Sequence, residues 1–238
     1  MSLKNNKKNM YLRNITYTRC DLQITRQDVM AVRDVMVAGR PLNKSVSAEL
    51  QDQVACHEIG HALVATLLED YMEVVQRVTI TPTSSGAGGL TFFAPRRNDG
   101  AEAPITTRKD LEQKLTVLLA GRAAEEVLFS KMQVSLGASH DLQQAEQLAR
   151  TMVTSGGMAF KGAEPRVSLQ AKGLKAADDV DAAAQAFVTA AYAKAQALLT
   201  QHRALLIALA QRLVVDKSMP GAVVRRAARK AAAAPPSA

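Results

Sequence analysis

The chain has 238 residues, of which 47% are hydrophobic and 22% charged, so it is long enough to bury a core without disulfide bonds. Two cysteines and no tryptophan argue against a disulfide-stabilised secreted domain and against the aromatic platform of single-strand nucleic-acid binders. The longest apolar runs, such as residues 204–210, have seven residues, whereas a membrane span needs about 20.

The net charge of +8 belongs to the two ends of the chain. Residues 1–20 carry five basic residues and no acidic one, and residues 217–238 carry the same. Residues 21–216 contain 20 basic and 22 acidic residues, so the body of the protein is nearly neutral. We therefore expect solvated or partner-contacting tails, and we expect no nucleic-acid binding.

The first half of the body predicts two helices. Residues 22–39 have apolar residues at helical spacing, and the glycine and proline that follow end this helix. Ser47 is a candidate N-cap for a long helix that continues to about Glu69.

The middle of the chain predicts a small β-element followed by a capped helix. Residues 74–81 are rich in β-branched residues, and a glycine-rich connection joins them to residues 90–95, which favours a hairpin. Thr107 and Asp110 have the spacing of a capping box, which predicts a helix from there to about Phe129.

The last third predicts further helices. Ser139 is a candidate cap for a helix that ends near Thr154. Two helices rich in alanine and leucine are expected at about 178–202 and 203–215. Pro220 interrupts the pattern that follows, and we expect the Ala/Pro-rich residues 231–238 to be disordered.

The sequence His57-Glu58-Ile59-Gly60-His61 lies inside the predicted long helix. Residues i and i+4 share one face of a helix, so the two imidazoles can bind one metal ion with Glu58 beside it. Bound zinc lowers the pKa of its water from about 16 to about 7, and a carboxylate can then remove the proton. The alternative is a pair of core histidines, but the motif favours a metal site.

A catalytic zinc site needs a third protein ligand and an open position. The residues alone leave four candidates for this ligand, namely His140, Asp141, Glu125 and Glu126. Asp141 falls in the first turn of a predicted helix, where a carboxylate is well placed, although acidic residues are common there without a metal.

Two other features are interpreted structurally. Cys56 precedes His57 and faces away from it on a helix, so we interpret it as a small core residue and not as a metal thiol. The glycine-rich residues 86–89 lack a following lysine and do not open a helix, so they favour a flexible hairpin over a phosphate-binding loop.

Four segments resemble, in order and spacing, the peptidase domain of the FtsH-type ATP-dependent zinc metalloproteases. They are HEIGHAL (57–63), GGLTFFAP (88–95), LLAGRAAEEVLF (118–129) and GASHDLQQAEQLARTMV (137–153). The second segment is most similar to the chloroplast and cyanobacterial branch. The resemblance covers about residues 25–215 and weakens at 156–180. Residues 24–39 resemble the last helix of the ATPase module that normally precedes the peptidase.

The resemblance implies a mainly α fold: a helical zinc metallopeptidase domain with a small β-hairpin or edge strand and a C-terminal helical bundle. It implies that Zn²⁺ is bound by His57, His61 and Asp141, that Glu58 is the general base, and that Glu125 orients a ligand histidine. It also implies an edge strand that binds substrate peptides through Gly88, Gly89, Leu90, Thr91 and Phe92.

The resemblance further implies unfolded or membrane-derived proteins as substrates, a hexameric ring, and a separate ATPase as a possible partner. It places the protein on the stromal side of the thylakoid or on the cytoplasmic face of a bacterial membrane. The expected organisation is a basic extension (1–23), the end of an ATPase lid (24–40), the zinc peptidase domain (41–216) and a basic, Ala/Pro-rich tail (217–238).

The chain departs from this family in two respects. His140 stands where the family usually has asparagine, and we expect it to form a hydrogen bond and not to compete for metal, because helical neighbours point about 100° apart. There is also no GxxxxGK[ST] motif and hence no P-loop, as expected for a fragment of a longer protein or for a stand-alone peptidase. The alternative to an endopeptidase is a structural subunit of a larger assembly, but scaffolding has no use for Glu58.

Overall fold

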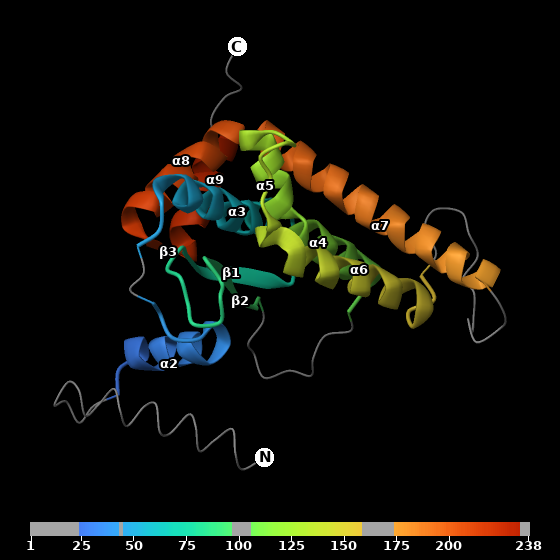
Figure 1. Ribbon diagram of the computed structural model, residues 1–238, viewed down its shortest axis with the longest axis horizontal. Helices are drawn as coiled ribbons and strands as arrows, with labels where there is room; N and C mark the ends of the chain where they lie inside the picture. Colours follow the sequence, from blue (N-terminus) through green and yellow to red (C-terminus); the bar gives the residue numbers. More distant parts are fainter. Residues whose placement is uncertain (1–23, 43–44, 97–105, 159–173, 234–238) are drawn as a thin grey trace. The chain divides into compact units, whose positions relative to one another are not determined.

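A computed structural model describes residues 24–42, 45–96, 106–158 and 174–233 (Figure 1). The described residues fall into two compact units. One unit contains the first helix and residues 81–90, and the other contains the remaining described elements.

The first unit is built around helix α2 (Arg26–Ala38). Thr25 accepts a hydrogen bond from the Asp28 N–H and donates its own N–H to the Asp28 carboxylate, so the helix begins with a capping box. Gly39 ends it with φ at 82°, and a Cβ atom there would lie 2.6 Å from the Ser84 hydroxyl oxygen. The helix expected at residues 22–39 is therefore present, but it starts four residues later, and residues 22–23 lie outside the described part of the chain.

Helix α3 (Ala48–Leu67) occupies the centre of the second unit. The Ser47 hydroxyl accepts a hydrogen bond from the Leu50 N–H, which confirms this residue as the N-cap. Residues 55–65 are all buried, so this helix is covered on every side. The elements that pack on it include α5 (Ala120–Phe129), α8 (Arg203–Asp216), α9 (Gly221–Ala233) and strand β1 (Glu73–Thr79).

A sheet of three strands, in the order β2-β1-β3, lies beside α3. The Arg96 N–H donates to the Met72 carbonyl, so the end of β2 (Leu90–Pro95) meets the start of β1, as in the expected hairpin. The third strand, β3 (Ser218–Pro220), runs antiparallel to β1. The strand β2 is consequently an edge of the sheet.

A second apolar cluster joins α4 (Arg108–Leu118), α6 (Ser139–Thr154) and α7 (Leu174–Gln201), which pack along one another in Figure 1. Its buried side chains include Leu115, Met152 and Phe187. A short 3₁₀ helix, η1 (Leu136–Ala138), precedes α6, so Ser139 is the first residue of this helix and Ala138 precedes it as the N-cap. None of the described helices is both long and apolar enough to cross a bilayer.

The sequence predicted a single helix from Thr107 to Phe129, and this prediction is wrong at one point. The capping box of Thr107 and Asp110 is present, but the helix breaks at Leu119 into α4 and α5. The break lets α5 pack against α3 while α4 packs mainly against α6 and α7. Both segments have good helical propensity, so the break is imposed by tertiary packing.

Residues 218–233 form a strand and a helix, whereas the sequence suggested a tail over 217–238, of which residues 234–238 lie outside the described residues. Pro220 ends an edge strand, a position that needs no N–H donor from the residue. Gly221 begins α9 so close to β1 that a Cβ atom would lie 1.9 Å from the Val75 carbonyl oxygen. Met219 and Val224 are buried in the main core. Short-range patterning could not reveal this packing.

We expect a chain that ends at Asp216 to lose stability, because it lacks β3 and the buried side chains of Met219 and Val224. Burial of such side chains contributes about 1.5–3 kcal/mol each, which corresponds to a melting temperature about 10 °C lower. Thermal unfolding followed by circular dichroism measures this. The full chain with exposed Arg229 and Lys230 both replaced by alanine is the control, and it should melt like the wild type. An unchanged melting temperature in the shortened chain would show that residues 217–238 are a tail that adds nothing to the stability of the core.

Candidate metal centre

Three side-chain atoms converge at the middle of the second unit. The Nε2 atoms of His57 and His61 lie 3.0 Å apart, and the Asp141 Oδ2 atom lies 3.1 Å from the first and 3.2 Å from the second. Helix α3 supplies the two imidazoles one turn apart, and the first turn of α6 supplies the carboxylate. These three residues form a group that could hold a metal ion.

The other nitrogen of each imidazole has an acceptor, and in a neutral ring this fixes which nitrogen carries the proton. His57 Nδ1 lies 2.8 Å from Glu125 Oε1, and His61 Nδ1 lies 2.7 Å from the carbonyl oxygen of Val117. A carbonyl only accepts, and so does an ionised carboxylate, so both Nδ1 atoms donate. In neutral rings the two Nε2 lone pairs then face each other and Asp141. Three acceptors this close repel one another unless a cation lies among them.

The surrounding charges favour such a cation. Burial by itself lowers the pKa of His57, but the hydrogen bonds with Asp141 and Glu125 raise it to about 10. The pKa of Asp141 lies well below its usual range, because its hydrogen bonds with the two histidines outweigh burial. The pKa of Glu125 is lowered in the same way by His57 and Ser135. The carboxylates around His57 therefore stabilise positive charge at this position, as a proton on the imidazole in the absence of an ion or as a bound cation.

The donor set fits zinc. Ligand atoms about 2.0–2.1 Å from a tetrahedral ion lie about 3.3 Å apart, close to the separations of 3.0–3.2 Å found here. Two imidazoles and a carboxylate are also typical of catalytic zinc sites. The Asp141 side chain is 23% exposed, so solvent can reach this side of the group.

Glu58 follows the first histidine on α3 and is buried, and this burial raises the pKa of its carboxyl group. The Thr91 hydroxyl lies 2.7 Å from Glu58 Oε2 and 3.0 Å from the main-chain oxygen of the same glutamate. The carboxylate is outside the group of three ligand atoms.

Two glycines allow α5 to pack closely against α3 and its two imidazoles. A Cβ atom on Gly121 would lie 2.4 Å from His57 Cε1 and 2.5 Å from His61 Nε2. A Cβ atom on Gly60 would lie 2.6 Å from the Ala120 carbonyl oxygen. Sequence reasoning missed the role of Gly121, although a glycine inside a helical pattern is a signal of close packing.

Glu125 is held in turn by the segment that precedes α6. The Ser135 N–H donates to Glu125 Oε2 at 2.7 Å, and the Ser135 hydroxyl donates to Oε1 at 3.2 Å. Glu125 is 1% exposed. The structure thus places Glu125 within hydrogen-bond distance of His57. It adds Ser135 and the Val117 carbonyl, which the sequence did not single out.

The remaining candidates lie elsewhere. His140 is exposed, and its Nε2 atom lies 2.6 Å from Gln144 Nε2, so it contacts the next turn of α6 and not the ligand group. Glu126 accepts hydrogen bonds from Arg122 and Gln196. Cys56 is fully buried, and burial raises the pKa of its thiol to about 12, as expected of a core residue.

The residues proposed to bind substrate are divided between the units. Gly88, Gly89 and Leu90 belong to the first unit, whereas Thr91 and Phe92 belong to the second. The Phe92 ring is buried, and the Arg77 guanidinium lies 4.7 Å from its centre. Of the two residues in the second unit, Thr91 forms a side-chain hydrogen bond with Glu58, and the side chain of Phe92 is buried.

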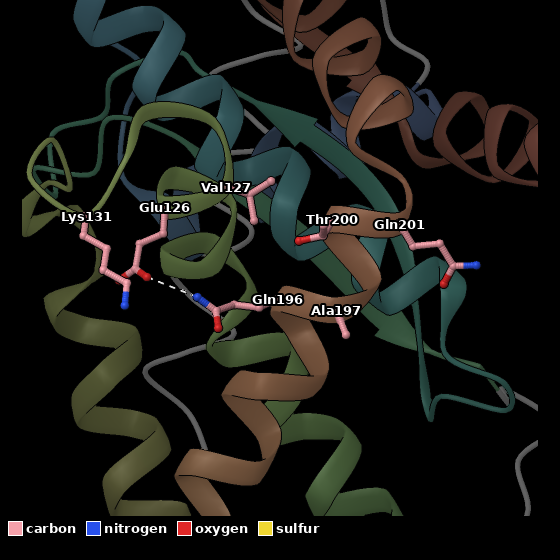
Figure 2. A pocket seen from close by; sticks show the side chains of 7 residues that line it. All are labelled: Glu126, Val127, Lys131, Gln196, Ala197, Thr200 and Gln201. Carbon is pink, nitrogen blue, oxygen red and sulfur yellow. Dashed lines mark hydrogen bonds between the residues drawn. The ribbon is translucent and has the colours of Figure 1, made fainter.

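A surface pocket of about 640 Å³ lies between α5 and α7, apart from the ligand group. Figure 2 shows Glu126 and Gln196 joined by a hydrogen bond across it, with Lys131 close by. No histidine lines it, so this pocket does not offer the chemistry of the metal centre.

We expect Glu125→Ala to weaken metal binding about 10- to 100-fold, the usual cost of removing a partner that orients a ligand. The alanine leaves the His57 Nδ1–H without its acceptor and removes a negative charge behind the ring. Zinc titration against a competing chelator measures the affinity. His140→Asn is the control, because it changes an exposed histidine next to Asp141 without touching the ligand atoms. Equal losses in both variants would contradict the role of Glu125.

The sequence matches Peptidase family M41 over residues 44–225, a range that includes the residues of the metal centre. It is 36% identical over 223 residues to the ATP-dependent zinc metalloprotease FTSH 1, chloroplastic, of Oryza sativa subsp. japonica, in an alignment that covers 87% of this chain and 32% of that protein.

The sequence identity to bacterial relatives is similar. Identity is 35% over 205 residues with the ATP-dependent zinc metalloprotease FtsH of Synechococcus sp. (strain JA-2-3B'a(2-13)), covering 80% of this chain and 31% of the relative. The chain is also 35% identical over 212 residues to the ATP-dependent zinc metalloprotease FtsH 3 of Synechocystis sp. (strain ATCC 27184 / PCC 6803 / Kazusa). That alignment covers 83% of this chain and 34% of the relative. The chain spans about a third of the length of these relatives.

Proposed function

Because the chain belongs to peptidase family M41, we propose that it is a zinc-dependent endopeptidase domain of the FtsH type. The family membership confirms the resemblance found in the four sequence segments. The observation that carries the proposal is the convergence of His57, His61 and Asp141 with Glu58 beside them. Each of these groups has a defined task in peptide hydrolysis.

The residues divide the chemistry among them. Zinc held by the three ligand atoms would supply a Lewis acid and a water molecule of lowered pKa. Glu58 takes the proton from the attacking water and later gives it to the leaving amine. Glu125 and the Val117 carbonyl keep the two imidazoles in the tautomer that presents Nε2 to the ion.

Substrates of this domain are unfolded or membrane-derived polypeptides that reach the site as extended segments. The edge strand β2 supports this part of the proposal, because a peptide can add to an unpaired edge through main-chain hydrogen bonds. Thr91 and Phe92, which belong to the second unit, would contribute main-chain groups to that edge.

The assembly and the location are proposed by similarity. The relatives are named ATP-dependent and several are named chloroplastic, so we propose a ring supplied with substrate by an ATPase, at the thylakoid stroma or at the cytoplasmic face of a bacterial membrane. A purely structural role is not favoured. Scaffolding requires neither the three ligand atoms nor a buried glutamate next to them.

Metal analysis combined with a hydrolysis assay tests the proposal. We expect about one zinc ion per chain and cleavage of unfolded casein that stops after chelation and returns when zinc is added. The His57→Ala variant is the control that lacks a complete metal site, and it should bind little zinc. A chain purified without chelator that holds no metal, or that cleaves casein equally well after chelation, would contradict the proposal.

A further inference from the structure

The carboxylate of Glu58 is held from a strand and not from its own helix. Thr91 lies in β2, and its hydroxyl is within 2.7 Å of Glu58 Oε2 and 3.0 Å of the Glu58 main-chain oxygen. A hydroxyl has a single hydrogen, so the two oxygens of Glu58 share it. One side chain thus joins β2 to both the backbone and the carboxylate of the same residue.

This contact restricts a side chain that would otherwise be mobile. Glutamate has three rotatable bonds, and a base must keep its oxygen within hydrogen-bond reach of the proton that it removes. The hydrogen bond from Thr91 fixes Oε2, which leaves Oε1 for the attacking water. Displacements of about 1 Å at such a group can change a rate about 100-fold.

Within the part of the chain that the structure describes, the strand that carries Thr91 also has an unpaired edge. The sheet order is β2-β1-β3, so only one side of β2 is paired within the sheet. Neighbouring side chains of a strand point to opposite faces, and here Phe92 packs in the core while Thr91 reaches α3. A peptide that binds along β2 would therefore fix the main chain of Thr91, and its hydroxyl would transmit that position to Glu58.

We propose that Thr91 is a positioning residue that couples the edge strand β2 to the general base, so that an extended peptide on this strand aligns the Glu58 carboxylate. The inference rests on the proposed function and adds to it a link between peptide binding and proton transfer. The two hydrogen bonds of the Thr91 hydroxyl both go to Glu58, so Thr91 acts through that residue.

Three variants test the coupling. Thr91→Val keeps the shape and removes the hydroxyl, and we expect kcat on unfolded casein to fall about 10- to 100-fold with KM changed less than about twofold. Thr91→Ser keeps the hydroxyl and should recover kcat to within about threefold of the wild type. Thr66→Val is the matched control, because the Thr66 hydroxyl on α3 only donates to the Ala62 carbonyl. Zinc content should be equal in all three.

A double-mutant cycle measures the contact without any assay of activity. Thr91→Val, Glu58→Ala and the double variant are unfolded in urea. We expect the effect of the double variant on the unfolding constant to differ about tenfold from the product of the single effects, as for a hydrogen bond to a charged group.

The outcomes separate the inference from the proposed function. Equal loss of kcat in Thr91→Val and Thr91→Ser, a higher KM with kcat unchanged, or additive effects in the cycle would each overturn the role of Thr91. A wild-type chain that binds zinc and cleaves nothing would contradict the proposed function. In that case the cycle still decides whether Thr91 holds Glu58.

Discussion

Replacing Glu58 by glutamine should abolish the hydrolysis of unfolded casein and leave the zinc content unchanged. The Glu58 carboxylate is outside the group of ligand atoms and is hydrogen-bonded to Thr91, so its loss spares the ligand set. An amide is not a base, and loss of a general base costs about 100- to 10,000-fold in rate. Casein hydrolysis and elemental analysis of the same preparation measure both effects.

Glu126→Gln is the matched control for this variant. It removes one carboxylate charge near the centre, but Glu126 contacts Arg122 and Gln196 and not the imidazoles. We expect this control to retain both zinc and activity. Wild-type hydrolysis by Glu58→Gln would contradict the assignment of the base, and loss of its metal would show that the carboxylate is a ligand.

Replacing Asp141 by alanine should remove both the metal and the activity. Two imidazoles remain, but the negative charge that balances the ion is lost, and the Nε2 atoms then face each other alone. We expect zinc affinity to fall by more than about 100-fold, beyond the usual cost of losing a partner that only orients a ligand. Zinc titrations of Asp141→Ala and Glu125→Ala, carried out side by side, show whether Asp141→Ala loses more zinc affinity than Glu125→Ala.

The neighbouring His140 provides the decisive comparison for Asp141. His140→Asn should bind zinc as the wild type does, because the imidazole contacts Gln144. A zinc-bound structure with His140 at about 2.1 Å from the ion would overturn the assignment. So would an Asp141→Ala variant that keeps its zinc.

Local patterns were sufficient for much of the fold. The caps at Ser47 and Thr107 predicted the starts of α3 and α4, because caps act within a few residues. Helical spacing alone predicted α2, and it placed the start of this helix four residues too early. The mainly α fold with a small sheet was predicted as well. The four-residue spacing of His57 and His61 also placed both imidazoles on one face of α3.

The remaining features depend on contacts between distant residues. The helix break at Leu119, the strand after Lys217 and the close approach of Gly121 to the imidazoles exist only when several elements pack together. The choice of the third residue in the candidate metal group depends on such contacts as well. Asp141 lies 80 residues after His61, and spacing along the chain could not distinguish it from Glu125.

The two histidines differ in how mutation can alter them. The partner of His57 is a side chain, so a single codon change at Glu125 can adjust the basicity of this ligand. The partner of His61 is the main-chain carbonyl of Val117, which every amino acid provides, so no substitution at that position deletes the acceptor. Variation of metal affinity among descendants of this sequence is therefore expected to arise on the Glu125 side. An engineer who wants to tune the site should begin at the same place.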